Sequence, residues 1–398
     1  MPARLRDLVL DPFALELASP LSTARGPIDR REGVLVRATV DGVRGVGEAT
    51  PLPGWTEPLD DCLDALRSIR ERDVAEAAAA LADLPVGEYP AARHGLQLAI
   101  ADARTRAAGA GVPLAAHLAS RGGVDHPSAD ALDADEDRTD PSLPDVDAST
   151  GSTDVVPDRV PVNATVGDED RDATVATVRD AVGAGYRAVK LKVGARGLDA
   201  DVERLRAARG AVGPDVELRA DANGAWDRET AAAAVDALAG VVDYVEQPLT
   251  ADDLAGHADL RGRGVPIALD ESLAGRSPAA VLAADAADVL ILKPMALGGV
   301  DRARAAASRA IEAGVAPVVT TTIDGAVARA GAVHLAASIP GVRPCGLATA
   351  GFLATDLLAD PAPVADGSAA VPEGPGLGDA FDGLRASGLG DETDGTDE

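Results

Sequence analysis

The sequence contains very little lysine. In a chain of 398 residues with 37 lysines and arginines together, only Lys190, Lys192 and Lys293 are lysines. Lys190 and Lys192 form a K-x-K within the apolar run 188–193, and Lys293 ends the apolar run 289–293. Arginine stays protonated at any ordinary pH, whereas lysine can lose its proton when it is buried or lies near another cation. The position of all three lysines in strand-like runs therefore predicts sites of proton transfer.

Cysteines and long apolar runs are also scarce. The two cysteines, Cys62 and Cys345, lie far apart in the sequence and form neither a metal-binding nor a disulfide spacing. No apolar run is long enough to span a bilayer, and the N-terminus has no recognisable signal peptide. We therefore expect no membrane insertion and a cytoplasmic location.

The chain is strongly acidic. Its formal net charge is −28, from 65 acidic against 37 basic residues, and aromatic residues make up only 2%. Such a surface repels nucleic acid and anionic membranes, so neither is an expected partner. Acidic excess with few lysines and aromatics is typical of a high-salt cytosol, where charges are screened. Because 46% of the chain is hydrophobic, we expect a folded core. The sequence leaves the oligomeric state open.

Composition divides the chain into five stretches. Residues 1–120 mix strand and helix patterns. Residues 121–158 contain ten Asp and one Glu among Ser, Thr, Pro and Gly, which predicts a solvated, disordered insertion. Residues 159–347 are regular, 348–386 form a C-terminal segment that becomes rich in Gly, Pro and acidic residues, and 387–398 are expected to be a disordered acidic tail.

The first stretch contains one clear hairpin signal. Residues 33–40 and 43–48 read as strands joined by the D-G turn at Asp41 and Gly42. Residues 75–84 and 91–108 have helical patterns, and the second ends near two glycines. This stretch is therefore predicted to be of mixed α+β type.

The long regular stretch repeats a strand, a loop and a helix. Alternation of strands with helices predicts a parallel sheet, and eight such strands over this length predict a closed (β/α) barrel. In barrels of this kind the active site lies at the carboxyl ends of the strands. The expected strands are 160–166, 188–193, 216–221, 241–246, 266–270, 288–293, 316–320 and a short one near 345–347.

Polar residues follow these apolar runs at regular intervals. Lys192, Asp221, Glu246, Asp270 and Lys293 are spaced by 29, 25, 24 and 23 residues, about one βα unit each. In a barrel their side chains would converge on one mouth. Three carboxylates in one pocket repel one another unless a cation joins them, and hard oxygen ligands in this number suit Mg²⁺, with Mn²⁺ as a substitute. A small carboxylate substrate could complete the coordination.

The lysines then gain a chemical role. An amine beside a second cation and a dication has a lowered pKa, so Lys192 is predicted to act as a base, with Lys190 contributing part of that shift. Lys293 would lie on the opposite side of the ligand. A metal that holds a carboxylate stabilises the enediolate formed when the neighbouring carbon loses its proton.

These motifs resemble a known series. Lys190-Leu191-Lys192, Asp221-Ala222-Asn223, Val245-Glu246-Gln247-Pro248, Asp270-Glu271-Ser272 and Leu292-Lys293-Pro294 are similar to motifs of the muconate-lactonizing subgroup of the enolase superfamily, in which Lys bases act with Mg²⁺. The segment 47–54 resembles the capping-domain loop of the same subgroup. Within the subgroup, the chain is most similar to the o-succinylbenzoate synthases of menaquinone synthesis. The resemblance covers residues 5–118 and 160–358.

The resemblance implies a fold and further site residues. It implies a (β/α)7β TIM-like barrel with an α+β capping domain, formed by the N-terminal stretch and part of the C-terminal segment. Asn223 and Glu271 would orient the metal ligands or the lysine amines. The cap loop, near residues 51–56, would close over the substrate. The expected substrate contacts are Trp55 in this loop, Gly298 after the sixth strand, and Thr321, Thr322 and Asp324 after the seventh.

The implied reaction is a Mg²⁺-dependent dehydration, that is, a carbon–oxygen lyase. Lys192 would remove the proton next to the substrate carboxylate and return it to the departing hydroxyl, while Lys293 contributes charge. One alternative is an N-acylamino-acid racemase, in which Lys192 and Lys293 alternate as acid and base. A more distant alternative is a lyase in which Lys293 forms a Schiff base. A dipeptide epimerase would show Asp-x-Asp at the eighth strand to hold the amine of its substrate. This chain has Gly346-Leu347-Ala348-Thr349 there, which disfavours that activity.

Overall fold

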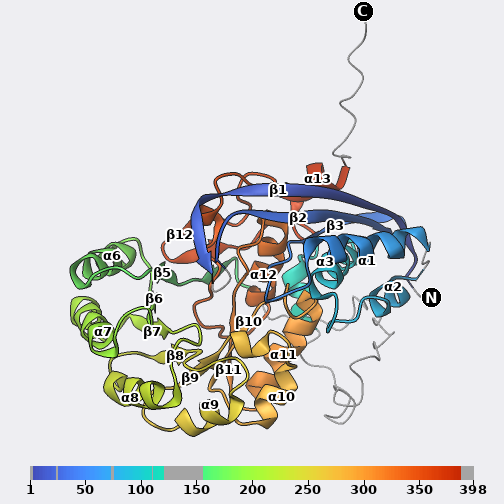
Figure 1. Ribbon diagram of the computed structural model, residues 1–398. Helices are drawn as coiled ribbons and strands as arrows, with labels where there is room; N and C mark the ends of the chain where they lie inside the picture. Colours follow the sequence, from blue (N-terminus) through green and yellow to red (C-terminus); the bar gives the residue numbers. More distant parts are fainter. Residues whose placement is uncertain (1–2, 24–25, 73–75, 110, 121–155, 387–398) are drawn as a thin grey trace, which may run out of the picture.

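A computed structural model describes residues 3–23, 26–72, 76–109, 111–120 and 156–386 of the chain. An antiparallel sheet with its helices lies beside a parallel barrel (Figure 1). The predicted insertion and acidic tail fall almost entirely outside the described residues, so their disorder stays a prediction, as do the domain boundaries.

The N-terminal sheet has three antiparallel strands, in the order β1, β2, β3. The predicted hairpin is confirmed, because Val40 pairs with Val43 across the turn. Asp41 and Gly42 both have positive φ, 49° and 87°, the conformation that a tight two-residue hairpin turn requires. The strands are β1 (Leu5–Thr23), β2 (Gly26–Val40) and β3 (Val43–Ala49).

Helix α3 (Pro90–Ala107) packs directly on this sheet through glycine. A Cβ atom at Gly47 would lie 2.0 Å from the carbonyl oxygen of Gly95, so only glycine permits this approach of the two backbones. The other helices of this part are α1 (Leu59–Glu71), α2 (Ala77–Ala82) and α4 (Leu114–Ser120). Sequence reading missed α1, although its buried residues Cys62, Leu66 and Ile69 have helical spacing.

The barrel contains seven hydrogen-bonded parallel strands in sequence order, which confirms the predicted α/β class. The segment at Cys345 and Gly346 provides the eighth position. Cys345 bridges Val162 and Gly346 bridges Thr320, so this segment links the first strand region to the last. The seven strands are β5 (Ala164–Val166), β6 (Ala188–Lys192), β7 (Glu217–Asp221), β8 (Tyr244–Glu246), β9 (Ile267–Leu269), β10 (Val289–Leu292) and β11 (Ala316–Val319).

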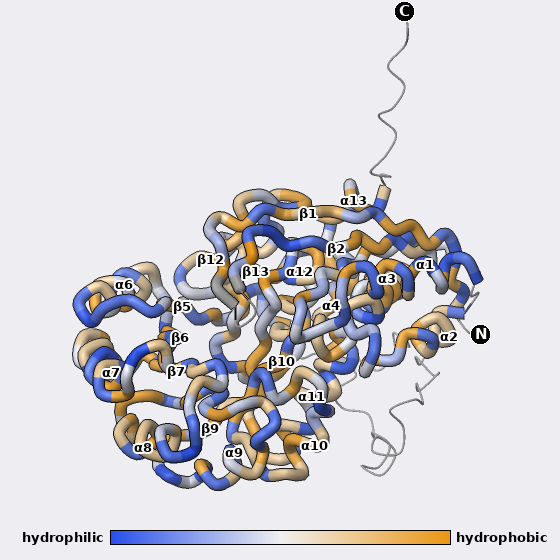
Figure 2. The backbone as a smooth tube through the Cα atoms, in the orientation of Figure 1, coloured by the Kyte–Doolittle hydropathy of each residue, from blue (hydrophilic) through white to orange (hydrophobic). Residues whose placement is uncertain are grey.

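Helices follow the strands around the outside of the barrel (Figure 1). Figure 2 shows hydrophilic residues along the outer turns of several of them, as expected for helices that bury one face. They are α6 (Arg171–Gly183), α7 (Leu198–Val212), α8 (Arg228–Leu238), α9 (Leu254–Leu260), α10 (Pro278–Ala283), α11 (Val300–Glu312) and α12 (Ala326–Ala337), with the short 3₁₀ helix η2 (Glu271–Leu273). No helix in the described ranges is both long and apolar enough to cross a membrane.

One predicted strand is divided. The expected strand 160–166 consists of β4 (Arg159–Pro161) and β5. β4 pairs outside the barrel with β13 (Ser368–Ala370), which in turn pairs with β12 (Val364–Ala365). Between β4 and β5, the amide of Val162 donates to Gly367 and that of Asn163 to Cys345. The chain thus changes partners at this point, which a continuous apolar pattern does not reveal.

The C-terminal segment returns to the N-terminal part. Leu353 bridges Leu17 of β1. The guanidinium of Arg385 donates to both carboxylate oxygens of Asp102 in α3, each at 2.8 Å. The segment contains η3 (Ala350–Phe352), η4 (Asp379–Phe381) and α13 (Asp382–Ala386).

Candidate active site

The polar residues at the strand ends come together at the carboxyl end of the barrel. Register pairs Lys192 of β6 with Asp221 of β7, and Asp221 with Glu246 of β8. Asp270 follows β9 directly, and Lys293 follows β10. Because these parallel strands are neighbours in the sheet, five side chains far apart in the sequence share one edge.

Ion pairs connect the lysines to the carboxylates. The Lys190 Nζ lies 2.9 Å from Asp221 Oδ2 and 2.8 Å from Glu246 Oε1. The Lys192 Nζ lies 2.7 Å from the same Asp221 oxygen. On the other side, the Lys293 Nζ lies 2.7 Å from Asp270 Oδ2. The site therefore contains two groups of opposite charges, one around Asp221 and one around Asp270.

The ammonium groups explain why the carboxylates do not form a ready-made metal cage. Among the described residues, no three His, Cys, Asp or Glu side chains converge as a group that could hold an ion. Lys190 lies between Asp221 and Glu246, where a cation would be expected. Asp270 Oδ1, however, is buried without a hydrogen-bond partner in the described structure. Its free lone pairs and the all-oxygen donor set fit a divalent cation.

Burial and mutual repulsion perturb the carboxyl groups. Burial, followed by the charge of Asp221, raises the pKa of Glu246 to about 7. Burial also raises the pKa of Asp270 to about 6, although the Lys293 ammonium opposes the rise. Burial alone would raise the pKa of Asp221, but the ammoniums of Lys190 and Lys192 hold it below its ordinary value. Such opposed shifts among neighbouring carboxyls are typical of functional sites.

The pKa of Lys190 is shifted in the direction opposite to the one expected for a buried lysine. Burial would lower its pKa, but the charges of Asp221, Glu246 and Asp270 outweigh burial and hold the pKa well above its ordinary value. Lys190 is therefore a fixed positive charge in this arrangement. Its side chain is 17% exposed, against 38% for Lys192, so Lys192 is the more accessible amine.

Asn223 and Glu271 form a hydrogen-bonded path beside Lys192. Asn223 Oδ1 accepts from the Lys192 Nζ at 2.8 Å, and its Nδ2 donates to Glu271 Oε1 at 2.9 Å. The Asn223 amide donates to Asp221 Oδ1 at 3.1 Å, with φ at 44°. The second oxygen of Glu271 is buried without a partner in the described structure. Asn223 is thus placed to orient both the amine and the carboxylate.

Gln247 is an organising residue that sequence reading quoted in a motif without assigning it a role. Its Oε1 accepts from the amides of Asp270 and Ser272 at 3.0 and 3.2 Å, and its Nε2 donates to Ser272 Oγ at 2.9 Å. It therefore holds the chain that carries Asp270. The motif Glu246-Gln247-Pro248 at the end of β8 was the feature of the sequence that could have identified this role.

The cap loop reaches the site through Trp55. The Lys293 ammonium lies 3.3 Å from the centre of the Trp55 ring. A tight turn shapes the loop, because the Trp55 amide donates to Leu52 O at 2.9 Å. Contact between Trp55 and substrate stays a prediction; in this structure its ring lies over Lys293.

The other expected substrate contacts lie in different surroundings. Thr321 Oγ1 lies 3.2 Å from Thr349 Oγ1, and the Thr322 hydroxyl donates to buried Asp324. Burial raises the pKa of Asp324. At Gly298, a Cβ atom would lie 2.8 Å from Val86 of the cap, so this glycine allows the cap to approach. Substrate contact by these residues stays a prediction.

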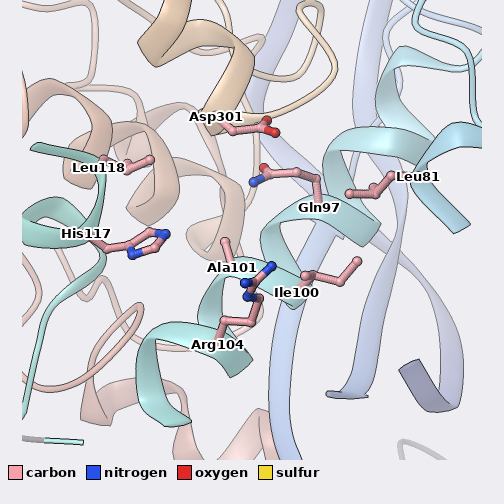
Figure 3. Close-up of a pocket in the computed structure, with 8 residues that line it drawn as sticks. All are labelled: Leu81, Gln97, Ile100, Ala101, Arg104, His117, Leu118 and Asp301. Carbon is pink, nitrogen blue, oxygen red and sulfur yellow. The ribbon is translucent and has the colours of Figure 1, made fainter. Parts of the chain in front are cut away.

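Figure 3 shows a pocket whose lining residues include none of the three lysines and none of the strand-end carboxylates. Gln97 and Asp301 lie near one another on one side, and Arg104 and His117 project from α3 and α4 (Figure 3). Its remaining lining residues are Leu81, Ile100, Ala101 and Leu118.

The fold and the site together define a class of protein: a (β/α) barrel with carboxylates and lysines at the carboxyl ends of its strands. The family model for enolase C-terminal domain-like proteins matches residues 173–385, and the chain belongs to this family. This confirms the resemblance to the enolase superfamily. The chain is 43% identical over 216 residues to the o-succinylbenzoate synthase of Thermobifida fusca, and 40% identical over 223 residues to that of Mycobacterium tuberculosis H37Rv. These matches cover 52% and 54% of this chain and 64% of each relative, so the match spans just under two thirds of the relatives' length.

Solved structures agree on the fold. The L-Ala-D/L-Glu epimerase of Bacillus subtilis superposes with a TM-score of 0.77 at 25% identity, covering 94% of this chain and 98% of the epimerase. The muconate lactonizing enzyme of Pseudomonas fluorescens superposes with a TM-score of 0.75 at 24% identity, covering 97% and 98%. Both matches extend over the cap and the barrel together.

Proposed function

We propose that this protein is an o-succinylbenzoate synthase. It would dehydrate 2-succinyl-6-hydroxy-2,4-cyclohexadiene-1-carboxylate to o-succinylbenzoate in menaquinone biosynthesis. The observation that carries the proposal is an amine on each side of the carboxylates, Lys192 at Asp221 and Lys293 at Asp270. The similarity to the synthase of Thermobifida fusca supports the choice of reaction.

Asp221, Glu246 and Asp270 would hold a divalent cation, Mg²⁺ or Mn²⁺. They are at most 4% exposed, and the unpartnered Oδ1 of Asp270 supports the fit. Bound there, the cation would hold the substrate carboxylate and offset the negative charge that develops when the adjacent carbon is deprotonated.

Lys192 would carry the proton through both steps. Its neutral Nζ takes the proton from the ring carbon next to the carboxylate. The resulting ammonium then donates that proton to the hydroxyl on the neighbouring carbon. The carbon–oxygen bond breaks, water leaves, and the electron pair of the former C–H bond completes the aromatic ring. Asn223, which accepts a hydrogen bond from the Lys192 Nζ, would hold that atom in position.

Lys293 would act through its charge. Its ammonium is fixed between Asp270 and the face of Trp55, and its side chain is 11% exposed. The Asp270 carboxylate and the face of Trp55 both attract a positive charge, so they hold the Lys293 Nζ in place. A fixed positive charge is what a one-base dehydration needs from the second lysine.

A second candidate is an N-acylamino-acid racemase on the same site. It is favoured by the same pair of amines, because Lys192 and Lys293 contact different carboxylates and could act on opposite faces of a substrate.

We further propose that the enzyme works in a high-salt cytosol, on the basis of its net charge of −28.

The test is turnover by the purified chain. Loss of the cyclohexadiene absorbance should require Mg²⁺ and stop in excess chelator. N-acylamino acids should be offered in parallel in deuterated solvent. Racemisation without dehydration would show that the protein is a racemase and not a synthase. Full dehydration in excess chelator would show that the reaction does not need the metal.

A further inference from the structure

Buried polar residues that the proposed proton transfer does not use gather where the cap meets the barrel. The anchor cluster consists of Arg31, Glu48 and Thr50 of the cap, His94 of α3, and Asp324 after β11. Each of these side chains is at most 3% exposed. Burying charged groups is unfavourable unless they are paired and hydrogen-bonded, so each contact in such a cluster constrains geometry.

Glu48 caps a barrel helix from the neighbouring part of the fold. Its Oε1 accepts from the Gly325 amide at 2.7 Å, and its Oε2 accepts from the Ala328 amide at 3.0 Å. These amides belong to the N-cap and the first turn of α12, where N–H groups have no partner within the helix. A carboxyl group is also favoured there by the helix dipole. Glu48 therefore fixes β3 to the start of α12.

Arg31 joins two loops that border the barrel mouth. Its guanidinium donates to the carbonyl oxygens of Thr50 and Pro51 at 2.8 and 3.1 Å. Its Nε donates to the carbonyl oxygen of Ile323 at 3.1 Å. The first two acceptors begin the cap loop, and the third belongs to the loop between β11 and α12. The planar fork of arginine makes these bonds at once, which lysine cannot do.

The cap loop runs from this cluster to the active-site lysine within a few residues. The Thr50 hydroxyl donates to Glu48 at the base of the loop. The Leu52 amide donates to Thr56 Oγ1 at 2.8 Å, which closes the loop on itself. Between these points, Trp55 contacts Lys293. A displacement at the base therefore transfers to the Trp55 ring through a short, tightly bonded segment.

We propose that Arg31 and Glu48 are positioning residues that hold the cap loop so that Trp55 covers Lys293. This inference rests on the proposed function, in which the Lys293 charge acts on the reacting substrate. Their hydrogen bonds go to the base of the cap loop, the loop after β11 and the start of α12, so both act on the site through Thr50 and Trp55. The cap loop is thus fixed at its base.

The experiment compares Arg31→Lys and Glu48→Gln with Arg37→Lys. Arg37 is the matched control because it lies on the same strand, is 6% exposed, and pairs with Asp11 within the cap. All variants carry Trp226→Phe, since the chain has two tryptophans. Acrylamide quenching of Trp55 fluorescence reports the cover on Lys293 without any substrate. kcat and KM are measured on the substrate that the parent chain turns over.

Arg31→Lys and Glu48→Gln should each raise the quenching constant of Trp55 at least about twofold and lower kcat at least about tenfold, because a misplaced group weakens catalysis. Arg37→Lys should change neither, whatever it does to the melting temperature. Unchanged quenching and kcat in both anchor variants would overturn the proposal, and so would an equal effect of Arg37→Lys. If Arg31→Lys does not fold, Glu48→Gln decides alone. Quenching is read without substrate, so absence of dehydration in the parent chain would count against the proposed function and not against the anchor.

Discussion

The Lys293 ammonium lies between the Asp270 carboxylate, 2.7 Å away, and the centre of the Trp55 ring, 3.3 Å away. One partner comes from the barrel and the other from the cap. The position of an active-site charge therefore depends on how the two parts of the fold meet.

Trp55→Leu should lower kcat/KM about tenfold, because the loss of a desolvated cation–π contact is worth about 1–2 kcal/mol. Trp226→Phe is the control, since Trp226 is also buried, whereas the ring over Lys293 is that of Trp55. Steady-state kinetics at matched protein stability measures the effect. Equal rates for Trp55→Leu and the parent would show that the ring over Lys293 has no part in turnover.

Asp221→Asn, Glu246→Gln and Asp270→Asn should each reduce activity by a factor of about 1000 or more, the scale of removing a main transition-state contact. The barrel should still fold, because these residues stand at strand ends. Calorimetric titration with Mg²⁺ gives a readout independent of activity, and each variant should bind the ion more weakly. Asp243→Asn is a suitable control because Asp243 lies before β8, at the opposite end of that strand. Undiminished Mg²⁺ affinity in all three variants would refute the ligand set.

Stability should depend on pH through Glu48. Burial and the nearby charge of Asp324 raise its pKa from 4.5 to about 7. A raised pKa means that the folded state binds a proton that the unfolded state releases. The contribution is therefore fully present below pH 4.5 and is lost as pH rises through about 7, up to about 3 kcal/mol in all.

Denaturant unfolding at a series of pH values tests this dependence. The unfolding free energy of the parent minus that of Glu48→Gln should fall as pH rises between these limits. Arg31 and His94 face Glu48 and are present in both proteins, so their effects largely cancel in the difference. A difference that stays constant, or increases with pH, would contradict the assigned direction.

Salt should stabilise the fold. Self-repulsion within a net charge of −28 is screened as ionic strength increases, so the melting temperature should rise between about 0.1 M and about 2 M KCl. Differential scanning calorimetry in KCl, with sucrose at equal osmolality as the control, measures the shift. A melting temperature that is highest at low salt would contradict adaptation to a high-salt cytosol.

The sequence predicted the strand-end residues well because each follows an apolar run at the spacing of one βα unit. Predicting Asp221 and Glu246 as site residues required no knowledge of contacts between distant parts of the chain. The ion pairs of Lys190 with both Asp221 and Glu246 were not predicted. They depend on the direction of a side chain two residues before Lys192 in the same strand.

The anchor cluster could not have been predicted in the same way. Glu48 and Gly325 are bonded across 277 residues, and Arg31 and Ile323 across 292. No local periodicity marks such pairs. The resemblance implied a substrate contact for Gly298, but the space that Val86 of the cap leaves beside this glycine is visible only in the folded structure.

The central claim is that Lys192 alone transfers the proton while Lys293 supplies charge. Arginine keeps the charge but cannot act as a base at ordinary pH. Dehydration of the cyclohexadiene substrate should therefore fall by a factor of about 1000 or more in Lys192→Arg, the scale of removing an essential base. It should remain measurable, although reduced, in Lys293→Arg. Comparing single-turnover dehydration rates of these two variants is the most direct test. Comparable dehydration in Lys192→Arg and the parent, or complete loss in Lys293→Arg together with one-sided α-proton exchange on an N-acylamino acid, would contradict the one-base account.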